Sequence, residues 1–173
     1  MEAQFYWDAK LFNSSIIGDI EGVIAALAQG GRVAVRDRKG YTPLLTAVEN
    51  GHTDMCGLLL ARGSNVNEVI PDGKQTALHF AALLGQNALV EALLSWGAEV
   101  NPEDHAGFTP LNAACQEGHL LCVLTLLKAG ASLTLPDNPG QQALPIHLAA
   151  RRNRVEVVKS LLDHGCSLDM VGW

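Results

Sequence analysis

Thr109-Pro110-Leu111-Asn112 is one version of a pattern that occurs four times along the chain, each time followed closely by alanine. The first residues of the four versions are 34, 33 and 35 residues apart. Internal similarity at so constant a period is typical of a solenoid, in which stacked copies of one unit share a continuous core. In chain order the four versions are Thr42-Pro43-Leu44-Leu45, Thr76-Ala77-Leu78-His79, Thr109-Pro110-Leu111-Asn112 and Leu144-Pro145-Ile146-His147.

Each unit is predicted to contain two short helices joined by a tight turn. A threonine oxygen can cap the first helix, and proline fits the first helical position, where its missing N–H costs nothing. In the second helix apolar residues recur at intervals of three and four, as in Val123 with Leu126 and Leu127. A glycine suited to a left-handed cap closes each second helix. These glycines are Gly30, Gly63, Gly97, Gly130 and Gly165.

The chain resembles the ankyrin-repeat family. The resemblance is carried by the stretches from Asp37 to Leu44 and from Asp104 to Leu111, and it extends over nearly the whole chain. It implies an all-α solenoid of stacked helix-turn-helix units with β-turn fingers projecting to one side. Two departures are expected to change a finger without disturbing the stack: the adjacent Asp72-Gly73, and the extra residues around Asn138-Pro139.

One domain is expected, covering residues 1–173, because five repeats share one core. The first repeat is hidden, but placing Gly18 in register with Gly51 aligns Leu11-Phe12 with Leu44-Leu45. Phe5, Tyr6 and Trp7 precede this repeat and are expected to cover the open end of the stack. The last repeat keeps an apolar outer face, so we hypothesise that the chain is the N-terminal part of a longer protein or meets another subunit there. The repeats are expected at about 4–36, 37–70, 71–103, 104–136 and 137–169.

The charge balance bears on the kind of partner. The chain has 12 Lys and Arg against 18 Asp and Glu, and its formal net charge is −6. Nucleic-acid binding depends on clustered cations, so this balance argues against a nucleic-acid partner. No apolar run reaches the roughly 18 residues that a membrane span needs, and the N-terminus has no signal sequence. We therefore expect a cytoplasmic or nuclear protein that does not insert into membranes.

The histidines and cysteines suggest no chemistry. His79 and His147 occupy the fourth position of the repeated pattern, and His52 and His119 follow the glycine that separates the two helices. The chain has no Gly-x-Ser-x-Gly motif and no phosphate-binding glycine loop. Its four cysteines lack Cys-x-x-Cys spacing and are expected to be small buried residues. We predict no enzyme activity, no cofactor and no metal; the cysteines are Cys56, Cys115, Cys122 and Cys166.

The resemblance also implies where a partner binds, on the fingers and on the exposed ends of the first helices. Apolar side chains are expected in the early repeats, and a basic run of Arg151, Arg152 and Arg154 in the last. Such a groove suits a peptide or protein with apolar anchors and an acidic end. The helix-end positions are Ile16, Ile17, Glu49, Asn50, Leu83, Leu84, Gln116, Glu117, Arg151 and Arg152, and the finger positions are Arg38, Lys39, Tyr41, Gln75, His105, Phe108 and Ala143.

Structural roles for the same residues stay open. Tyr41 and Phe108 can instead pack against the neighbouring finger. A long neighbouring side chain can cover Leu83 and Leu84, and the arginines can form an ordinary solvated face.

The predicted function is a non-catalytic adaptor or scaffold for protein–protein recognition. Two narrower alternatives stay open within it. One is the substrate-receptor part of a SOCS-box-type ubiquitin ligase. The other is a small kinase inhibitor of the ankyrin type, although those proteins have a shortened first helix in the second repeat, whereas Pro43 to Glu49 has full length here.

The resemblance further implies that Asn67 and Asn101 can be hydroxylated by the oxygenase that modifies ankyrin repeats; alternatively, they only support the turn. Hydroxylation of one asparagine predicts an intact mass about 16 Da higher in protein from cells than in protein from a host that lacks the oxygenase. The increase should disappear when the modified asparagine is replaced by alanine. Equal masses from both sources would exclude hydroxylation, and the two asparagines would then have only the turn-supporting role.

Overall fold

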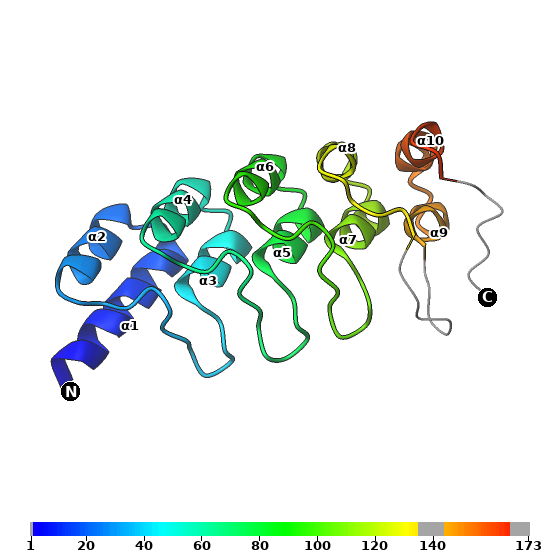
Figure 1. Ribbon diagram of the computed structural model, residues 1–173. Helices are drawn as coiled ribbons and strands as arrows, with labels where there is room; N and C mark the ends of the chain where they lie inside the picture. Colours follow the sequence, from blue (N-terminus) through cyan, green and yellow to red (C-terminus); the bar gives the residue numbers. More distant parts are fainter. Residues whose placement is uncertain (1, 135–143, 167–173) are drawn as a thin grey trace.

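The computed structural model describes residues 2–134 and 144–166, which form five pairs of helices placed side by side in a row (Figure 1). The first, or inner, helices of the pairs are α1 (Glu2–Ile17), α3 (Pro43–Glu49), α5 (Ala77–Leu83), α7 (Pro110–Glu117) and α9 (Pro145–Arg151). The second, or outer, helices are α2 (Ile20–Ala28), α4 (Thr53–Ala61), α6 (Asn87–Ser95), α8 (Leu120–Lys128) and α10 (Val155–Asp163).

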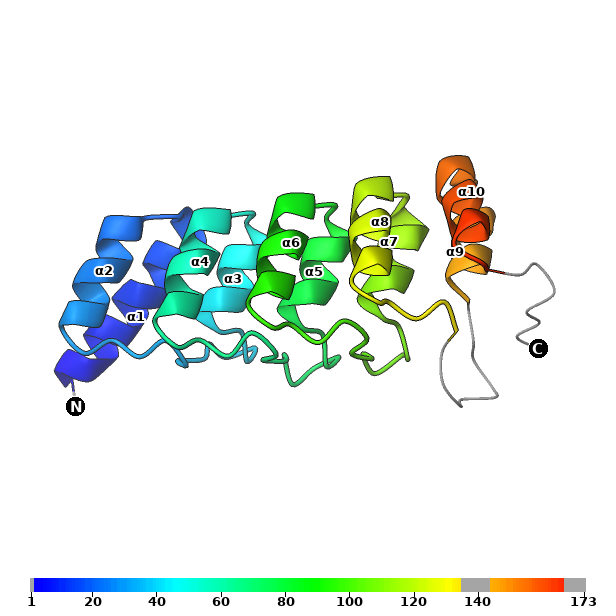
Figure 2. The same cartoon turned by 45° about the horizontal axis from the view of Figure 1, so that its top comes forward.

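The helices form two layers, with the outer helices on one side and the inner helices on the other (Figures 1 and 2). Loops that follow the first, second and third pairs extend from the inner layer and form the first three fingers (Figures 1 and 2). The only β pairing within the described residues is an isolated bridge between Val69 and Thr76. The predicted all-α solenoid of stacked helix-turn-helix units is confirmed.

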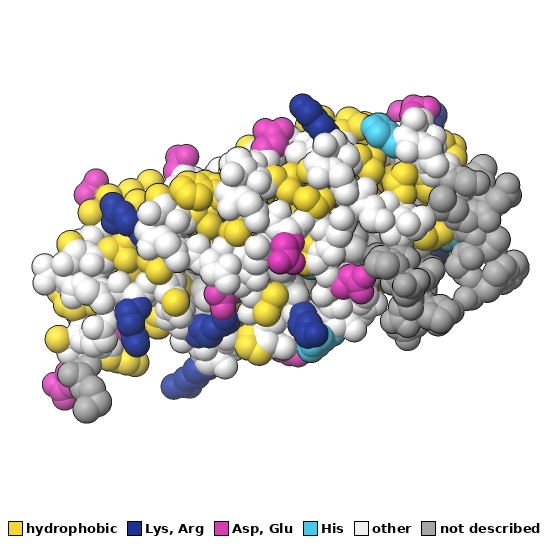
Figure 3. Space-filling view, in the orientation of Figure 1, with side chains coloured by type: hydrophobic (Ala, Val, Ile, Leu, Met, Phe, Trp, Pro, Cys, Tyr) yellow, Lys and Arg dark blue, Asp and Glu magenta, His cyan; other side chains and the backbone are white. Residues whose placement is uncertain are grey.

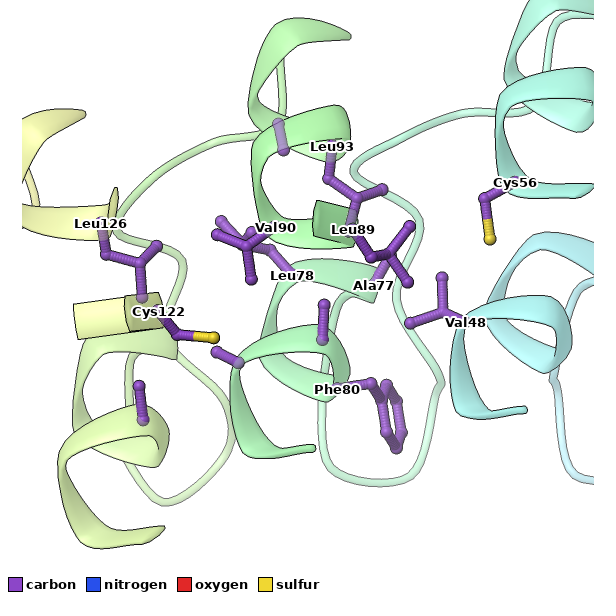
Figure 4. Close-up of a cluster of buried hydrophobic side chains, with 14 of the residues drawn as sticks. Val48, Cys56, Ala77, Leu78, Phe80, Leu89, Val90, Leu93, Cys122 and Leu126 are labelled. Atoms are coloured by element: carbon purple, nitrogen blue, oxygen red, sulfur yellow. The ribbon is translucent and has the colours of Figure 1, made fainter. Parts of the chain in front are cut away.

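A continuous apolar core runs between the two layers. Leu78 on α5 and Leu89 and Leu93 on α6 are fully buried or nearly so, and Cys122 and Leu126 of the next pair lie in the same cluster (Figure 4). The small Ala81 and Ala82 are buried completely, which permits close packing of neighbouring inner helices. Each pair therefore buries its apolar residues largely against the pairs beside it.

The predicted threonine caps are present. Thr42 and Thr109 each accept a hydrogen bond from the backbone N–H three residues later, at 3.3 Å. Thr76 forms a full capping box with His79. Leu144 replaces threonine before α9, and its side chain is buried in the core without capping the helix. The fold thus keeps a helix start at this position through apolar packing.

Histidines on the turns of the second and fourth pairs connect each of these pairs to the preceding one. His52 donates to the Ile16 carbonyl oxygen at 3.0 Å, and His119 donates to the Leu83 carbonyl oxygen at 3.0 Å. Gly85 is needed at one of these contacts. It has a φ of +71°, and a Cβ there would lie 2.6 Å from the Nδ1 atom of His119. The interpretation that His52 and His119 belong to the architecture is confirmed.

The fingers close in two ways. In the first and third, one carboxylate oxygen of Asp37 or Asp104 accepts two backbone N–H groups at 2.8–2.9 Å. All three have a backbone bond across the base, but in the second, where Asp72-Gly73 breaks the pattern, Ile70 takes the place of the aspartate: its N–H donates to the Gln75 carbonyl oxygen and its carbonyl oxygen accepts from the Lys74 N–H, both at 3.1 Å. This finger is altered while the helices on either side remain stacked, as predicted. Asn138-Pro139, Ala143 and Leu168–Trp173 lie outside the described residues.

The N-terminus differs from the prediction. Phe5, Tyr6 and Trp7 lie within α1, which is 16 residues long, whereas the other inner helices have seven or eight. Trp7 packs against the core, but Phe5 and Tyr6 are 77% and 57% exposed, so the expectation that all three cover the end of the stack is wrong. The apolar side chains precede the repeat in sequence, yet α1 continues through them because no helix-breaking residue intervenes.

Buried Asp8 holds this long helix to the first finger. Its carboxylate accepts hydrogen bonds from the Arg32 backbone at 2.8 Å and the Arg32 guanidinium at 2.5 Å, and from Gln4 at 3.0 Å. Burial alone raises the pKa of Asp8, but the hydrogen bonds from Arg32 and Gln4 outweigh it and hold that pKa below its ordinary value.

His79 connects α5 to the third finger. The Thr76 backbone N–H donates to its Nδ1 atom at 3.1 Å, so the proton is on Nε2, which donates to the Phe108 carbonyl oxygen at 2.9 Å. Burial lowers the pKa of His79 and outweighs the opposing influence of the Phe108 carbonyl and Asp104. The ring is therefore held neutral, with both nitrogens bonded.

Acidification should reduce the free energy of unfolding that the neutral His79 side chain contributes. The unfolded chain gains a proton on His79 below about pH 6.5 while the folded chain does not, so the free energy of unfolding should fall by at most about 1.4 kcal/mol per pH unit until the lower folded pKa is reached. Urea unfolding of the wild type and His79→Gln from pH 7.5 to 5.5 measures this. The two stabilities should converge as the pH falls. A difference in stability between the two proteins that stays constant over this pH range would contradict the prediction.

Candidate functional site

The five predicted helix-end pairs occupy equivalent places at the ends of successive inner helices, so they form a row along the stack (Figure 1). Ile16, Ile17, Glu49, Asn50, Arg151 and Arg152 are exposed, and Gln116 and Glu117 are half-buried. Leu83 and Leu84 are 36% and 45% exposed, so no neighbouring side chain covers them fully. The row therefore presents apolar groups in the first and third repeats and cations in the fifth.

The backbone beneath this row is already bonded. The carbonyl oxygens of Ile16, Leu83 and Gln116 each accept a hydrogen bond from a side chain of the next pair. Their side chains are what remains for a partner. Packing of the pairs thus fixes the backbone of these helix ends, while the side chains of the helix-end residues stay accessible to a partner.

The finger residues divide into packed and exposed positions. Tyr41 is half-buried, and its ring centroid lies 6.1 Å from that of Phe80 on α5, so it packs onto the following repeat. Phe108 and Gln75 are also half-buried. Arg38, Lys39 and His105 are exposed at the finger tips, and the finger edge of the molecule carries several basic side chains (Figure 3). Tyr41 therefore makes a packing contact with the next repeat, and part of its side chain also stays accessible to a partner.

A shallow hollow of about 250 Å³ brings five of the predicted residues together. It lies between the ends of α1 and α3 and the first finger, and Phe12 and Asp37 also line it. The predicted residues in it are Ile16, Lys39, Tyr41, Glu49 and Asn50. The structure thus joins helix-end and finger positions of the first two repeats into one concave surface.

The basic end of the row is smaller than the sequence suggested. The Arg154 side chain donates to the Gln116 carbonyl oxygen at 3.3 Å and lies 4.0 Å from the Glu117 carboxylate. Gln116 also donates to Glu117 at 3.1 Å. Arg154 therefore takes the structural place that His52 and His119 have in other repeats, which leaves Arg151 and Arg152 as the exposed cations.

Asn67 and Asn101 join successive repeats. The side-chain oxygen of Asn67 accepts from the Glu99 backbone at 2.9 Å, and that of Asn101 accepts from the Ser132 backbone at 2.8 Å. These contacts support the predicted structural role. Hydroxylation of either residue stays a prediction.

Sequence reasoning missed a second, larger hollow of about 450 Å³ between α1 and the first finger. Phe5, Ala9 and Phe12 line it from the helix, and Val35 and Arg38 line it from the finger. The available signal was the spacing of Phe5, Ala9, Phe12 and Ile16, which places them on one helical face. It was overlooked because Phe5 was assigned to a segment before the first repeat, whereas Phe12 and Ile16 were placed within that repeat.

In the described residues, the burial of the cysteines and the placement of possible metal ligands bear on reactive and metal-binding chemistry. All four cysteines are buried. Burial raises the pKa of Cys56 to about 12 and that of Cys122 to about 11, which disfavours the reactive thiolate. No group of three or more His, Cys, Asp or Glu side chains in the described residues is placed to hold a metal, and no helix there could cross a membrane.

Comparison with known proteins agrees with this geometry. A family model described as ankyrin repeats, in three copies, matches residues 11–104, 71–137 and 97–171. The ankyrin repeat and KH domain-containing protein mask-1 of Caenorhabditis elegans is 33% identical over 87% of this chain and 6% of its own length. The rat nuclear factor NF-kappa-B p105 subunit is 30% identical over 92% of this chain and 17% of its own.

A third relative, human ankyrin repeat and SOCS box protein 6, is 33% identical over 76% of this chain and 35% of its own length. The chain thus spans between 6% and 35% of the length of these three relatives. Family model, relatives and helix pairs agree along most of the chain. The chain belongs to the ankyrin-repeat family, whose stacked repeats form protein–protein interaction modules.

Proposed function

We propose that this chain is a non-catalytic recognition module that binds a peptide or protein surface along the row of inner-helix ends and fingers. The observation that carries the proposal is the exposure of Leu83 and Leu84 at the centre of this row. Apolar groups left exposed beside polar ones are typical of interaction sites. Arg151 and Arg152, exposed at the far end of the row, can each form a forked contact with a partner's carboxylate.

A substrate-receptor role in a SOCS-box-type ubiquitin ligase is the narrower alternative that we keep. Human ankyrin repeat and SOCS box proteins 6 and 16 are 33% and 34% identical to this chain over 76% and 72% of it. The proposal requires that the cellular protein contain a SOCS box. Sequencing of the full-length cellular protein tests this, and a product without that segment would exclude the role.

A kinase-inhibitor role receives less support. α3, the first helix of the second repeat, has seven residues, as have α5 and α9. The shortened helix that the resemblance attributes to such inhibitors is therefore not found here.

Photo-crosslinking tests the groove. A photoreactive residue at Leu84, irradiated in cell lysate, should capture a partner identifiable by mass spectrometry. In a protein that also carries Leu83→Ser, Arg151→Glu and Arg152→Glu, capture should fall at least tenfold, because removing contacts worth about 1.4 kcal/mol changes affinity that much.

The matched control carries Leu121→Ser, Arg62→Glu and Lys128→Glu. It makes the same changes in polarity and charge at residues outside the row, and it should leave capture unchanged. If the row variant and the control variant lost capture equally, or if neither variant lost it, the groove would not be the binding surface.

A further inference from the structure

Within residues 2–134 and 144–166, the N-terminal half of α1 has no equivalent in the other repeats. α1 is 16 residues long, and its first turns extend beyond the inner layer to the level of the fingers (Figure 1). Bonds from Asp8 to Arg32 hold this extension against the first finger, residues 31–42. The extension is therefore a fixed wall of a surface that the second, third and fourth repeats lack.

One face of this wall is apolar and open. Phe5, Ala9, Phe12 and Ile16 follow one another at intervals of four, three and four residues, so they lie along one side of the helix. The hollows of about 450 and 250 Å³ lie between this side and the first finger, and they adjoin because Phe12 and Asp37 line both. We call this combined surface, with Arg38 and Lys39 on the finger, the N-terminal trough.

The cations on the finger side of the trough differ in whether they already form an ion pair within the chain. Arg32 is bonded to Asp8, and Arg36 to Glu68. These two cations are already neutralised by partners within the chain, so they contribute little to a new contact.

Arg38 and Lys39 are different. Both are exposed, and neither forms an ion pair with any residue that the structure describes. The nearby Asp37 carboxylate accepts the backbone N–H groups of Lys39 and Tyr41 through one oxygen and keeps its negative charge, so the two cations and this carboxylate leave a net positive charge on the finger side. Two adjacent cations without an ion-pair partner outnumber this carboxylate at the edge of an apolar trough and favour a negatively charged partner, on a chain whose net charge is −6.

Glu49 limits where the negative charge can lie. It lines the far end of the trough, beside Asn50 and Ile16. A partner carboxylate is disfavoured at that end and favoured over Arg38 and Lys39. The trough therefore suits a partner with carboxylates along its finger side and apolar groups along α1.

We propose that the N-terminal trough binds an acidic amphipathic helical segment of another protein, whose apolar side chains lie along Phe5, Phe12 and Ile16. From Phe5 to Ile16 is about 16 Å along the helix, or three turns of a partner helix. This inference rests on the proposed function as a recognition module, and it names the partner class at one end of the module.

A random 16-residue peptide library displayed on phage and selected on the purified protein provides the probe. Enriched peptides should be acidic, with large apolar residues at intervals of three and four. Their synthetic forms should bind at least tenfold more weakly, by fluorescence anisotropy, to Phe12→Ser and to the double variant Arg38→Glu with Lys39→Glu. Binding should also weaken as salt is raised, because exposed charges are screened.

Matched controls lie on or beside the outer helices. Leu121→Ser removes a leucine that is 66% exposed on α8, and Arg62→Glu with Lys128→Glu reverses two exposed charges. These variants should bind the selected peptides like the wild type. Thermal unfolding by circular dichroism checks that Phe12→Ser is folded, and the double variant changes only exposed side chains.

Several results would overturn the inference. No enrichment, enrichment of basic or neutral peptides, or affinities unaffected by the trough variants would each do so. Peptides lost instead with Leu83→Ser, Arg151→Glu and Arg152→Glu would refute the trough while leaving the proposed function intact. Failure of groove-dependent capture from lysate would refute the proposed function separately.

Two other occupants are distinguishable. A dimer, seen by sedimentation and abolished by Phe12→Ser, would assign the trough to a second copy of the chain. Co-flotation with phosphatidylserine vesicles that requires Phe5 and Arg38 would assign it to a membrane surface. Either result would overturn the proposed protein partner.

Discussion

No helix pair of this chain can bury its apolar side chains alone. Leu78, Leu89 and Leu93 become buried because the pairs on both sides cover them, and the small Ala81 and Ala82 allow that close approach. The bonds from His52 to Ile16 and from His119 to Leu83 then fix the second pair on the first and the fourth pair on the third. The row of helix ends, the fingers and the hollows between them all follow from this dependence on neighbours.

Local patterns predicted most of the fold, because each is complete within a few residues. A capping threonine such as Thr109, followed by proline and alanines, specifies a helix start wherever it stands. The chain before Leu11 contains no such pattern, so the length of α1 could not be read from the repeat. The structural role of Arg154 was also missed, because an arginine there replaces the histidine of other repeats.

The site was predicted only in part, for a different reason. The repeat register places Leu83, Leu84 and Arg151 at helix ends, and the structure finds them there and exposed. The trough depends on how far α1 extends and on which arginines the fold neutralises. Glu68 lies 32 residues after Arg36, and no local pattern pairs them. The sequence therefore does not show which arginines of the finger form ion pairs within the chain and which do not.

The order of the helix pairs also sets the distance between the N-terminal trough and the arginines of the last repeat. The N-terminal trough belongs to the first pair, whereas Arg151 and Arg152 belong to the fifth, with three pairs between them. A partner that engages both ends gains avidity only if the chain between its two binding segments can span those three pairs, and a shorter connection confers none. If both surfaces bind, the solenoid would select partners by the distance between their binding segments as well as by their side chains.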